Sequence, residues 1–253
     1  MQKTLMYARM KRKGGEIMEE KSFIDKGILS SNMLKIIALI AMTIDHIGYF
    51  IYPSVLWWRI VGRLAFPIFA YLIAEGCRYT RSKKKHIITM FVFALVCQIV
   101  MSIALGNLMM NIFVTFAISQ VLIFAFDRAV KRKNAPSIIL AISILIVVAF
   151  VMLWLPSLLK EIVELDFDYG FFGAVLPLIV YFGGNKATRL FLCTIALIPV
   201  CLMTKGDIQW FCFFALIPLA LYNEKRGKLN LKYLFYLYYP IHVVVILLIS
   251  MLI

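Results

Sequence analysis

Apolar residues along this chain gather into long runs that are separated by short polar stretches. The runs fall at roughly 34–53, 57–76, 87–105, 110–126, 137–155, 170–182, 189–204, 208–222 and 233–253. A helix that crosses a bilayer needs about 20 apolar residues, because each residue adds about 1.5 Å of rise. The pattern therefore predicts an all-α, polytopic membrane helix bundle of about nine transmembrane helices, of which the sixth is the shortest.

The positive charges of the chain predict its orientation in the membrane. The segment up to Lys35 and every second loop after it carry 23 Lys and Arg residues, whereas the alternate loops carry only Lys160 and Lys205. Loops rich in Lys and Arg stay in the cytoplasm. We therefore predict a cytoplasmic N-terminus and an external C-terminus, in a multi-pass protein of the bacterial cytoplasmic (inner) membrane. The loop charges are expected to be solvated and to favour anionic lipid.

The composition agrees with a lipid-facing protein. Hydrophobic residues make up 63% of the chain, and the mean hydropathy is +0.90. Soluble domains carry roughly 45–50% apolar residues, so the excess must face the bilayer. The net charge of +14 follows from the topology, and nothing predicts a nucleic-acid partner. The five cysteines lack metal-type spacing, so we expect buried thiols and neither disulfides nor a metal site.

Two segments differ in character. Residues 1–33 are polar and mixed in charge, so we expect a loosely ordered cytoplasmic tail without a cleavable signal peptide. Residues 34–253 form the membrane domain. The codons of Lys13-Gly14-Gly15-Glu16 resemble a purine-rich ribosome-binding site, so we hypothesise that Met18 is the true initiator. N-terminal sequencing of the native protein that returned Met1 would refute this.

Several ionisable residues lie inside or beside the predicted spans. A charge at the centre of a span costs roughly 2.5–3.5 kcal/mol, so such residues usually pair and line a cavity. Arg59 and Arg63 share one helix face, as do the residues of the last span around Tyr238. We therefore predict a basic polar pocket with two histidines in the outer half of the bundle, built from Asp45, His46, Arg59, Arg63, Tyr238, Tyr239 and His242.

Lys35 and His46 are eleven residues apart, and eleven steps of about 100° return to nearly the same helix face. The rise over this interval is about 16 Å. This places a cation at the cytoplasmic surface in line with an imidazole deep in the membrane. The distance suits a coenzyme A thioester, which has phosphates at one end and an acyl group at the other. The alternative is that Lys35 is an interfacial lysine that snorkels to the surface.

Other charged residues have structural explanations. Asp45 is a candidate partner of Arg59 or Arg63, holding helices together. Glu75 and Arg78 are expected to form a boundary pair at the cytoplasmic end of the second span. His86 closes a basic run and is expected to be an exposed loop residue.

Three stretches carry a resemblance to a known family. They are Leu34–Ala38 with Met42–Gly48, Arg63–Tyr71 with Glu75-Gly76, and Tyr233–His242. The chain resembles the TraX family over about residues 33–253, and the founding member of that family is a membrane acetylase that N-acetylates F-pilin. TraX proteins are in turn similar to membrane acyltransferases of the O-antigen acetylase type.

The resemblance implies an activity and a set of site residues. In the wider group an Arg or Lys, ten residues and a His stand in the first span, with the cation linked to acyl-CoA binding and the His to catalysis. Here that pattern is Lys35-x10-His46. The chain departs from the group in two respects: about nine spans replace about ten, and Lys35 replaces the commoner Arg. A lysine offers a point charge where an arginine binds phosphate in a bidentate manner.

We therefore expect a membrane acetyltransferase that uses acetyl-CoA. Imidazole suits general-base catalysis near neutral pH, so His46 is the candidate base. Asp45 is assigned to the arginine pair beside it, and His242 to acceptor binding or to a second base. Arg63 is a candidate for binding the acetyl-CoA donor or for stabilising the oxyanion. Arg59, Tyr238 and Tyr239 are candidates for contacting the substrate or the oxyanion. Direct transfer and an acyl-His46 intermediate both remain open.

Two other classes of function compete with this expectation. A proton-coupled transporter or flippase could use the same Asp45-His46 site as a relay, although no internal repeat of the kind found in many transporters is seen. A non-enzymatic membrane partner of a secretion or conjugation apparatus is the third class. The sequence leaves the acceptor open among a pilin N-terminus, a peptide and a glycan.

Overall fold

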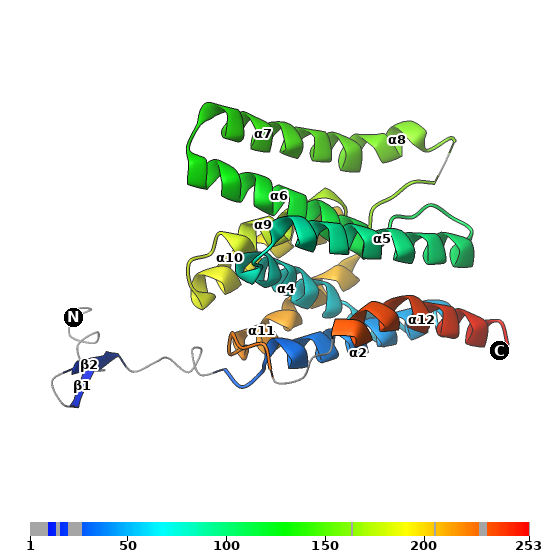
Figure 1. Ribbon diagram of the computed structural model, residues 1–253. Helices are drawn as coiled ribbons and strands as arrows, with labels where there is room; N and C mark the ends of the chain where they lie inside the picture. The colour runs from blue at the N-terminus through cyan, green and yellow to red at the C-terminus, as the bar shows by residue number, and fades with distance from the viewer. Residues whose placement is uncertain are drawn as a thin grey trace.

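The computed structural model describes residues 10–13, 16–19, 27–162, 164–204, 206–227 and 232–252. From residue 31 onward the described chain forms a helical bundle (Figure 1). Its elements are α2 (Ser31–Phe50), α3 (Leu56–Gly62), α4 (Ala65–Tyr79), α5 (Lys83–Leu105), α6 (Ile112–Arg132), α7 (Ala135–Ala149), η1 (Phe150–Trp154), α8 (Leu155–Leu159), α9 (Gly170–Tyr181), α10 (Lys186–Met203), η2 (Asp207–Ala215), α11 (Leu216–Ala220) and α12 (Lys232–Ser250).

Ahead of the bundle, β1 (Met10–Lys13) and β2 (Glu16–Glu19) pair as antiparallel strands. The register pairs Met10 with Glu19 and Lys13 with Glu16. The prediction that residues 1–33 form a cytoplasmic tail stays a prediction. The remainder of the tail up to residue 26 lies outside the described residues.

Side chains of Ser and Asn mark where the long helices begin. Ser30, Ser82, Asn111, Asn134 and Asn185 each accept a hydrogen bond from a backbone N–H in the first turn of α2, α5, α6, α7 and α10 respectively. Such caps satisfy N–H groups that have no partner within the helix. Polar residues that border the apolar runs therefore also define the helix boundaries.

Every predicted apolar run is occupied by helix. Within the described residues, six segments are long and apolar enough to cross a membrane, namely α2, α3 with α4, α5, α6, α7 with η1 and α8, and α10. The shorter apolar helices are α9, η2 with α11, and residues 237–250 of α12. The chain is thus a helical membrane protein, with the sixth run short as predicted. The count of nine spans and the N-in, C-out orientation stay predictions.

The helices differ in how much of their surface the bundle covers. α4 lies at the centre, and its buried residues include Tyr71 and Glu75. In α7 only Ser137 and Ala141 are buried, while Ile146 is 62% exposed. Exposed apolar side chains on this scale are expected where a helix faces lipid. Figure 1 shows α7 and α8 along one edge of the bundle, with α2 and α12 along the opposite edge.

α2 and α12 lie side by side and run in the same direction (Figure 1). Thr43 contacts Tyr238, and one turn later His46 contacts His242. The residue numbers of the contacts increase in the same direction along both helices, so the first and last helices of the bundle are parallel. This arrangement brings the two ends of the sequence into one site.

Candidate functional site

Asp45 is held between two arginines near the end of α2. Its Oδ2 accepts a hydrogen bond from Nη1 of Arg59, and its Oδ1 accepts one from Nη2 of Arg63, each at 2.7 Å. Nη1 of Arg63 also donates to Oε1 of Gln209 on η2 at 3.2 Å. The ion pair predicted from the sequence is therefore formed with both arginines. One carboxylate between two guanidiniums leaves this cluster with a net positive charge.

Two glycines allow α2 and α3 to approach this closely. A Cβ on Gly62 would lie 2.1 Å from Oδ1 of Asp45, and a Cβ on Gly48 would lie 2.4 Å from Cβ of Trp58. Both distances are far below a normal carbon contact. The carboxylate can therefore reach the arginines only because these positions carry no side chain.

His46 and His242 form a hydrogen bond between α2 and α12. Nδ1 of His46 lies 2.8 Å from Nε2 of His242, and Nδ1 of His242 lies 3.0 Å from the carbonyl oxygen of Tyr238. A carbonyl can only accept, so Nδ1 of neutral His242 carries a proton and its Nε2 accepts. Nδ1 of His46 must then donate. These partners assign to His46 the tautomer whose Nε2 holds an unshared electron pair.

The neighbouring tyrosines hold His242 in place. The Tyr238 ring stacks on the His242 ring at a centroid distance of 5.1 Å, and Tyr239 meets it edge-on at 5.4 Å. The hydroxyl of Thr43 donates to the Leu39 carbonyl at 2.8 Å, so the Tyr238 hydroxyl at 2.7 Å donates to Thr43. In this arrangement the Tyr238 proton already has an acceptor.

The arginines act on His46 as well as on Asp45. His46 interacts electrostatically with both Arg59 and Arg63. Among the described residues, the hydrogen bonds of Arg59 leave only from Nη1, and a guanidinium carries five N–H donors. The remaining donors of Arg59 can therefore serve a negative charge that develops near the imidazole.

Lys35 lies at the other end of α2. Its ammonium group sits over the ring of Phe235 on α12, 5.4 Å from the ring centroid. The side chain is half-buried. Lys35 and His46 are thus placed along one helix, each beside α12, as the eleven-residue spacing predicts.

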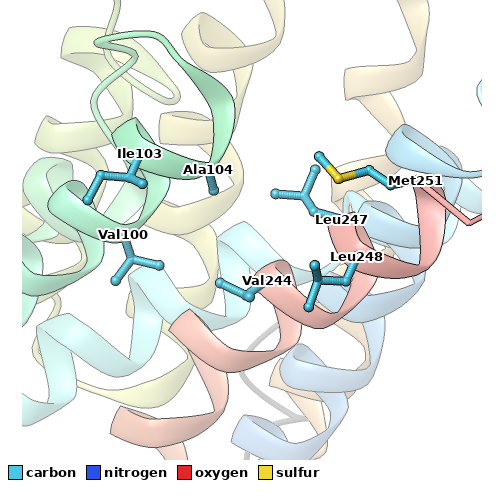
Figure 2. A pocket seen from close by; sticks show the side chains of 7 residues that line it. All are labelled: Val100, Ile103, Ala104, Val244, Leu247, Leu248 and Met251. Atoms are coloured by element: carbon cyan, nitrogen blue, oxygen red, sulfur yellow. The ribbon is translucent and has the colours of Figure 1, made fainter.

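An apolar cavity of about 320 Å³ opens between the last turns of α5 and α12. Figure 2 shows Val100, Ile103 and Ala104 of α5 facing Val244 and Leu247 of α12 across it. Its lining contains no ionisable residue. The cavity shares no lining residue with the polar cluster.

The TraX protein family model matches residues 30–250, nearly the whole of the described bundle. The chain belongs to the TraX family. The matched range contains every site residue predicted from the sequence, from Lys35 to His242.

Two relatives of this TraX protein have been found among curated proteins. An uncharacterized protein of Rickettsia prowazekii (strain Madrid E) is 28% identical over 205 residues, which cover 81% of this chain and 74% of the relative. A probable fimbrial assembly protein, FimC of serogroup H1 from Dichelobacter nodosus, is 24% identical over 251 residues, covering 85% and 93% respectively. No solved structure matches the chain.

The structure adds two residues that sequence reasoning left in loops or apolar runs. Asp168 lies just before α9 and interacts electrostatically with Arg63 and Asp45. Its side chain is exposed, and the desolvation that the surrounding chain imposes raises the pKa of its carboxyl to about 6. Gln209 was hidden because η2 read as an apolar run. For Asp168, the only signal in the sequence was its place just before the short sixth apolar run, which Pro177 interrupts.

Three expectations from the sequence are wrong. Glu75 and Arg78 do not pair: Glu75 binds Arg189, whereas Nη2 of Arg78 donates to the carbonyl oxygens of Tyr181 and Gly183. Helix packing brings α10 and the turn before it to α4, which residue spacing within α4 cannot show. His86 is not an exposed loop residue, because it lies in the first turn of α5, half-buried beside Gly76.

The third wrong expectation concerns the loop charges, some of which are buried. Arg189 at the start of α10 is 4% exposed and pairs with both Glu75 and Glu224. The Tyr222 hydroxyl donates to the second oxygen of Glu75 at 3.2 Å. A guanidinium between two carboxylates therefore joins α4, α10 and the segment after α11.

Proposed function

We propose that this TraX protein is a membrane acetyltransferase, which moves an acetyl group from cytoplasmic acetyl-CoA to an amine or hydroxyl acceptor. The observation that carries the proposal is the hydrogen bond between His46 and His242, from which the tautomer of His46 is assigned. Its Nδ1 proton is engaged by His242, so Nε2 is left as a base within a membrane-embedded cluster. A neutral imidazole oriented by a second group is the arrangement that general-base catalysis requires.

The proposed reaction uses the residues of the cluster in turn. Nε2 of His46 takes the proton of the acceptor while its nitrogen or oxygen attacks the thioester carbonyl carbon. The charge that develops on the carbonyl oxygen is stabilised by the net positive cluster of Arg59, Arg63 and Asp45. The carbon–sulfur bond then breaks, and the thiolate takes the proton from His46. The hydrogen bond to His242 holds the imidazole ring in place throughout.

The length of α2 supports a donor that reaches from the cytoplasm. Lys35 and His46 are separated by about 16 Å of helix rise and both lie beside α12. A phosphate-bearing head at Lys35 would place the far end of a pantetheine arm near His46. The Dichelobacter nodosus relative is a probable fimbrial assembly protein, which makes a fimbrial subunit the first acceptor to test.

The alternative function is proton-coupled transport. The hydrogen-bonded pair of His46 and His242, with Asp45 next to His46 in the sequence, also suits a proton relay. A transporter would move protons or substrate across a sealed membrane without consuming a thioester. The two functions therefore differ in a product that can be measured.

The test is made with the purified full-length protein in detergent and in sealed proteoliposomes. Acetyl-CoA is supplied with envelope proteins or glycans of the host, and free thiol release is followed together with the acceptor mass. The proposal predicts acceptor-dependent thiol release and an acceptor heavier by one acetyl group. Proton flux in the proteoliposomes without thiol release would instead support the transporter.

A further inference from the structure

The segment after α11 is hydrogen-bonded to the start of α2. The backbone N–H of Ser31 donates to the carbonyl of Lys225 at 2.8 Å, and the N–H of Asn32 donates to the carbonyl of Arg226 at 3.2 Å. The Ser31 hydroxyl donates to the same Arg226 carbonyl at 3.2 Å. These bonds use N–H groups that a helix start would otherwise offer to an anion. An anion site at this end must therefore come from side chains.

The same bonds bring Arg226 beside Lys35. Lys35 is three residues after Asn32 and four after Ser31, so the three lie on one face of α2. Arg226 is therefore anchored one turn before Lys35. The two positive charges interact electrostatically and repel each other. Phe235 of α12 covers the other side of Lys35.

Neither cation has a carboxylate partner among the described residues. The ion pairs in that part of the chain involve Asp45, Glu75, Asp127 and Glu224, and none of them includes Lys35 or Arg226. Two like charges held together without a counter-ion favour an anion that carries more than one negative charge. A pair of phosphate groups has this property.

The backbone at Arg226 is anchored by an ion pair two residues earlier. Glu224 binds Arg189, which also binds Glu75 in the centre of the bundle. Glu224 and Gly227 both adopt positive φ, 59° and 86°, so the backbone turns sharply on each side of Arg226. The ion pair and the backbone hydrogen bonds to the start of α2 thus fix the point from which the Arg226 side chain extends.

From this geometry we infer that Lys35 and Arg226 together bind the phosphate groups of the donor at the start of α2. The inference rests on the proposed acetyltransferase function and assigns a residue that the Lys35-x10-His46 pattern does not contain. Arg226 supplies the planar, bidentate donor that Lys35 cannot. In this arrangement Arg226 makes a bidentate contact with phosphate, and Lys35 adds a second positive charge.

The experiment compares Arg226→Ala and Arg226→Lys with Lys225→Ala, which removes a neighbouring exposed cation of the same segment. We expect Arg226→Ala to raise KM for acetyl-CoA and Kd for coenzyme A about tenfold, with kcat little changed. Arg226→Lys should recover part of the loss, and Lys225→Ala should stay within about twofold. Acetylpantetheine, which lacks the nucleotide phosphates, should not distinguish Arg226→Ala from the wild type.

The outcomes separate the two proposals. Turnover with an unchanged KM in Arg226→Ala, or an equal loss with acetylpantetheine, overturns the phosphate site and leaves the acetyltransferase intact. Coenzyme A binding that depends on Arg226 without any turnover supports the site and overturns the proposed reaction. Absence of both coenzyme A binding and turnover in the wild type overturns both.

Discussion

Two ionic clusters in this protein have opposite composition. Near the end of α2, one carboxylate, Asp45, lies between two guanidiniums, whereas at the start of α10 one guanidinium, Arg189, lies between two carboxylates. The side chains of Arg189 and Glu75 are 5% and 6% exposed, while those of Arg59 and Asp45 are 25% and 15% exposed. The first cluster is net positive and its side chains are partly exposed. The second cluster is net negative, and its Arg189–Glu75 pair is buried.

The difference distinguishes charges that stabilise the fold from charges that are available for the proposed reaction. Arg189 and Glu75 satisfy each other and join three parts of the fold. Asp45 satisfies its arginines but leaves a positive field beside His46, whose Nε2 is unprotonated. Breaking the Arg189 cluster should therefore cost stability, whereas breaking the histidine pair beside the Asp45 cluster should cost activity.

Arg189→Ala is expected to have the largest effect on stability. Glu75 would remain buried without its cation, and removing one partner of a buried ion pair typically costs about 3–5 kcal/mol. Thermal unfolding in detergent measures the loss. Lys131→Ala is the control, since Lys131 is 66% exposed in its pair with Asp127 and such a pair contributes about 0–1 kcal/mol. Equal unfolding temperatures for the two variants would contradict the structural role of Arg189.

Gly62→Ala should have an intermediate effect on the Asp45 cluster. Its new methyl group would meet Asp45 at 2.1 Å, so α2 and α3 must separate, at a cost of about 1–3 kcal/mol. Gly76→Ala is the matched control, because its Cβ would lie 3.6 Å from His86 Nε2, an ordinary contact. Acetyl transfer and unfolding temperature are measured for both variants. A Gly62→Ala protein as active and stable as Gly76→Ala would show that the approach of Asp45 to α3 is not tight.

Asp168 should give the smallest effect, through the pH dependence of stability. Desolvation raises the pKa of this carboxyl from 3.8 to about 6 in the folded protein. The folded state thus holds the proton more tightly, so its contribution to stability is present below about pH 4 and is lost as the pH rises through 6. Asp168→Asn should remove this part of the pH dependence of the unfolding temperature. The accessible surface of Asp168 keeps the change small, and parallel pH profiles for both proteins would contradict it.

Much of the bundle and part of the site could be predicted from the sequence. The apolar runs identify the helices because hydropathy is a local property of the sequence. The alignment of Lys35 with His46 follows from helix periodicity. The pairing of Asp45 with Arg59 and Arg63 follows from opposite charges in two successive spans, which a short loop keeps adjacent.

What the sequence could not provide is the packing between distant segments. Arg189 reads as a loop charge because its partners Glu75 and Glu224 are far away along the chain. The bond between His46 and His242 depends on α2 and α12 lying parallel, and helix periodicity says nothing about partners. Gln209 and Asp168 join the cluster for the same reason.

The central claim is tested most directly by the rate of acetyl transfer from acetyl-CoA in His46→Ala, with His86→Ala as the control that removes the one histidine outside the site. General-base catalysis contributes typically 10²–10⁴-fold, so we predict that His46→Ala loses at least about a hundredfold in rate with normal membrane insertion, while His86→Ala stays within about twofold. A His46→Ala protein that transferred acetyl groups as fast as the wild type would contradict the account.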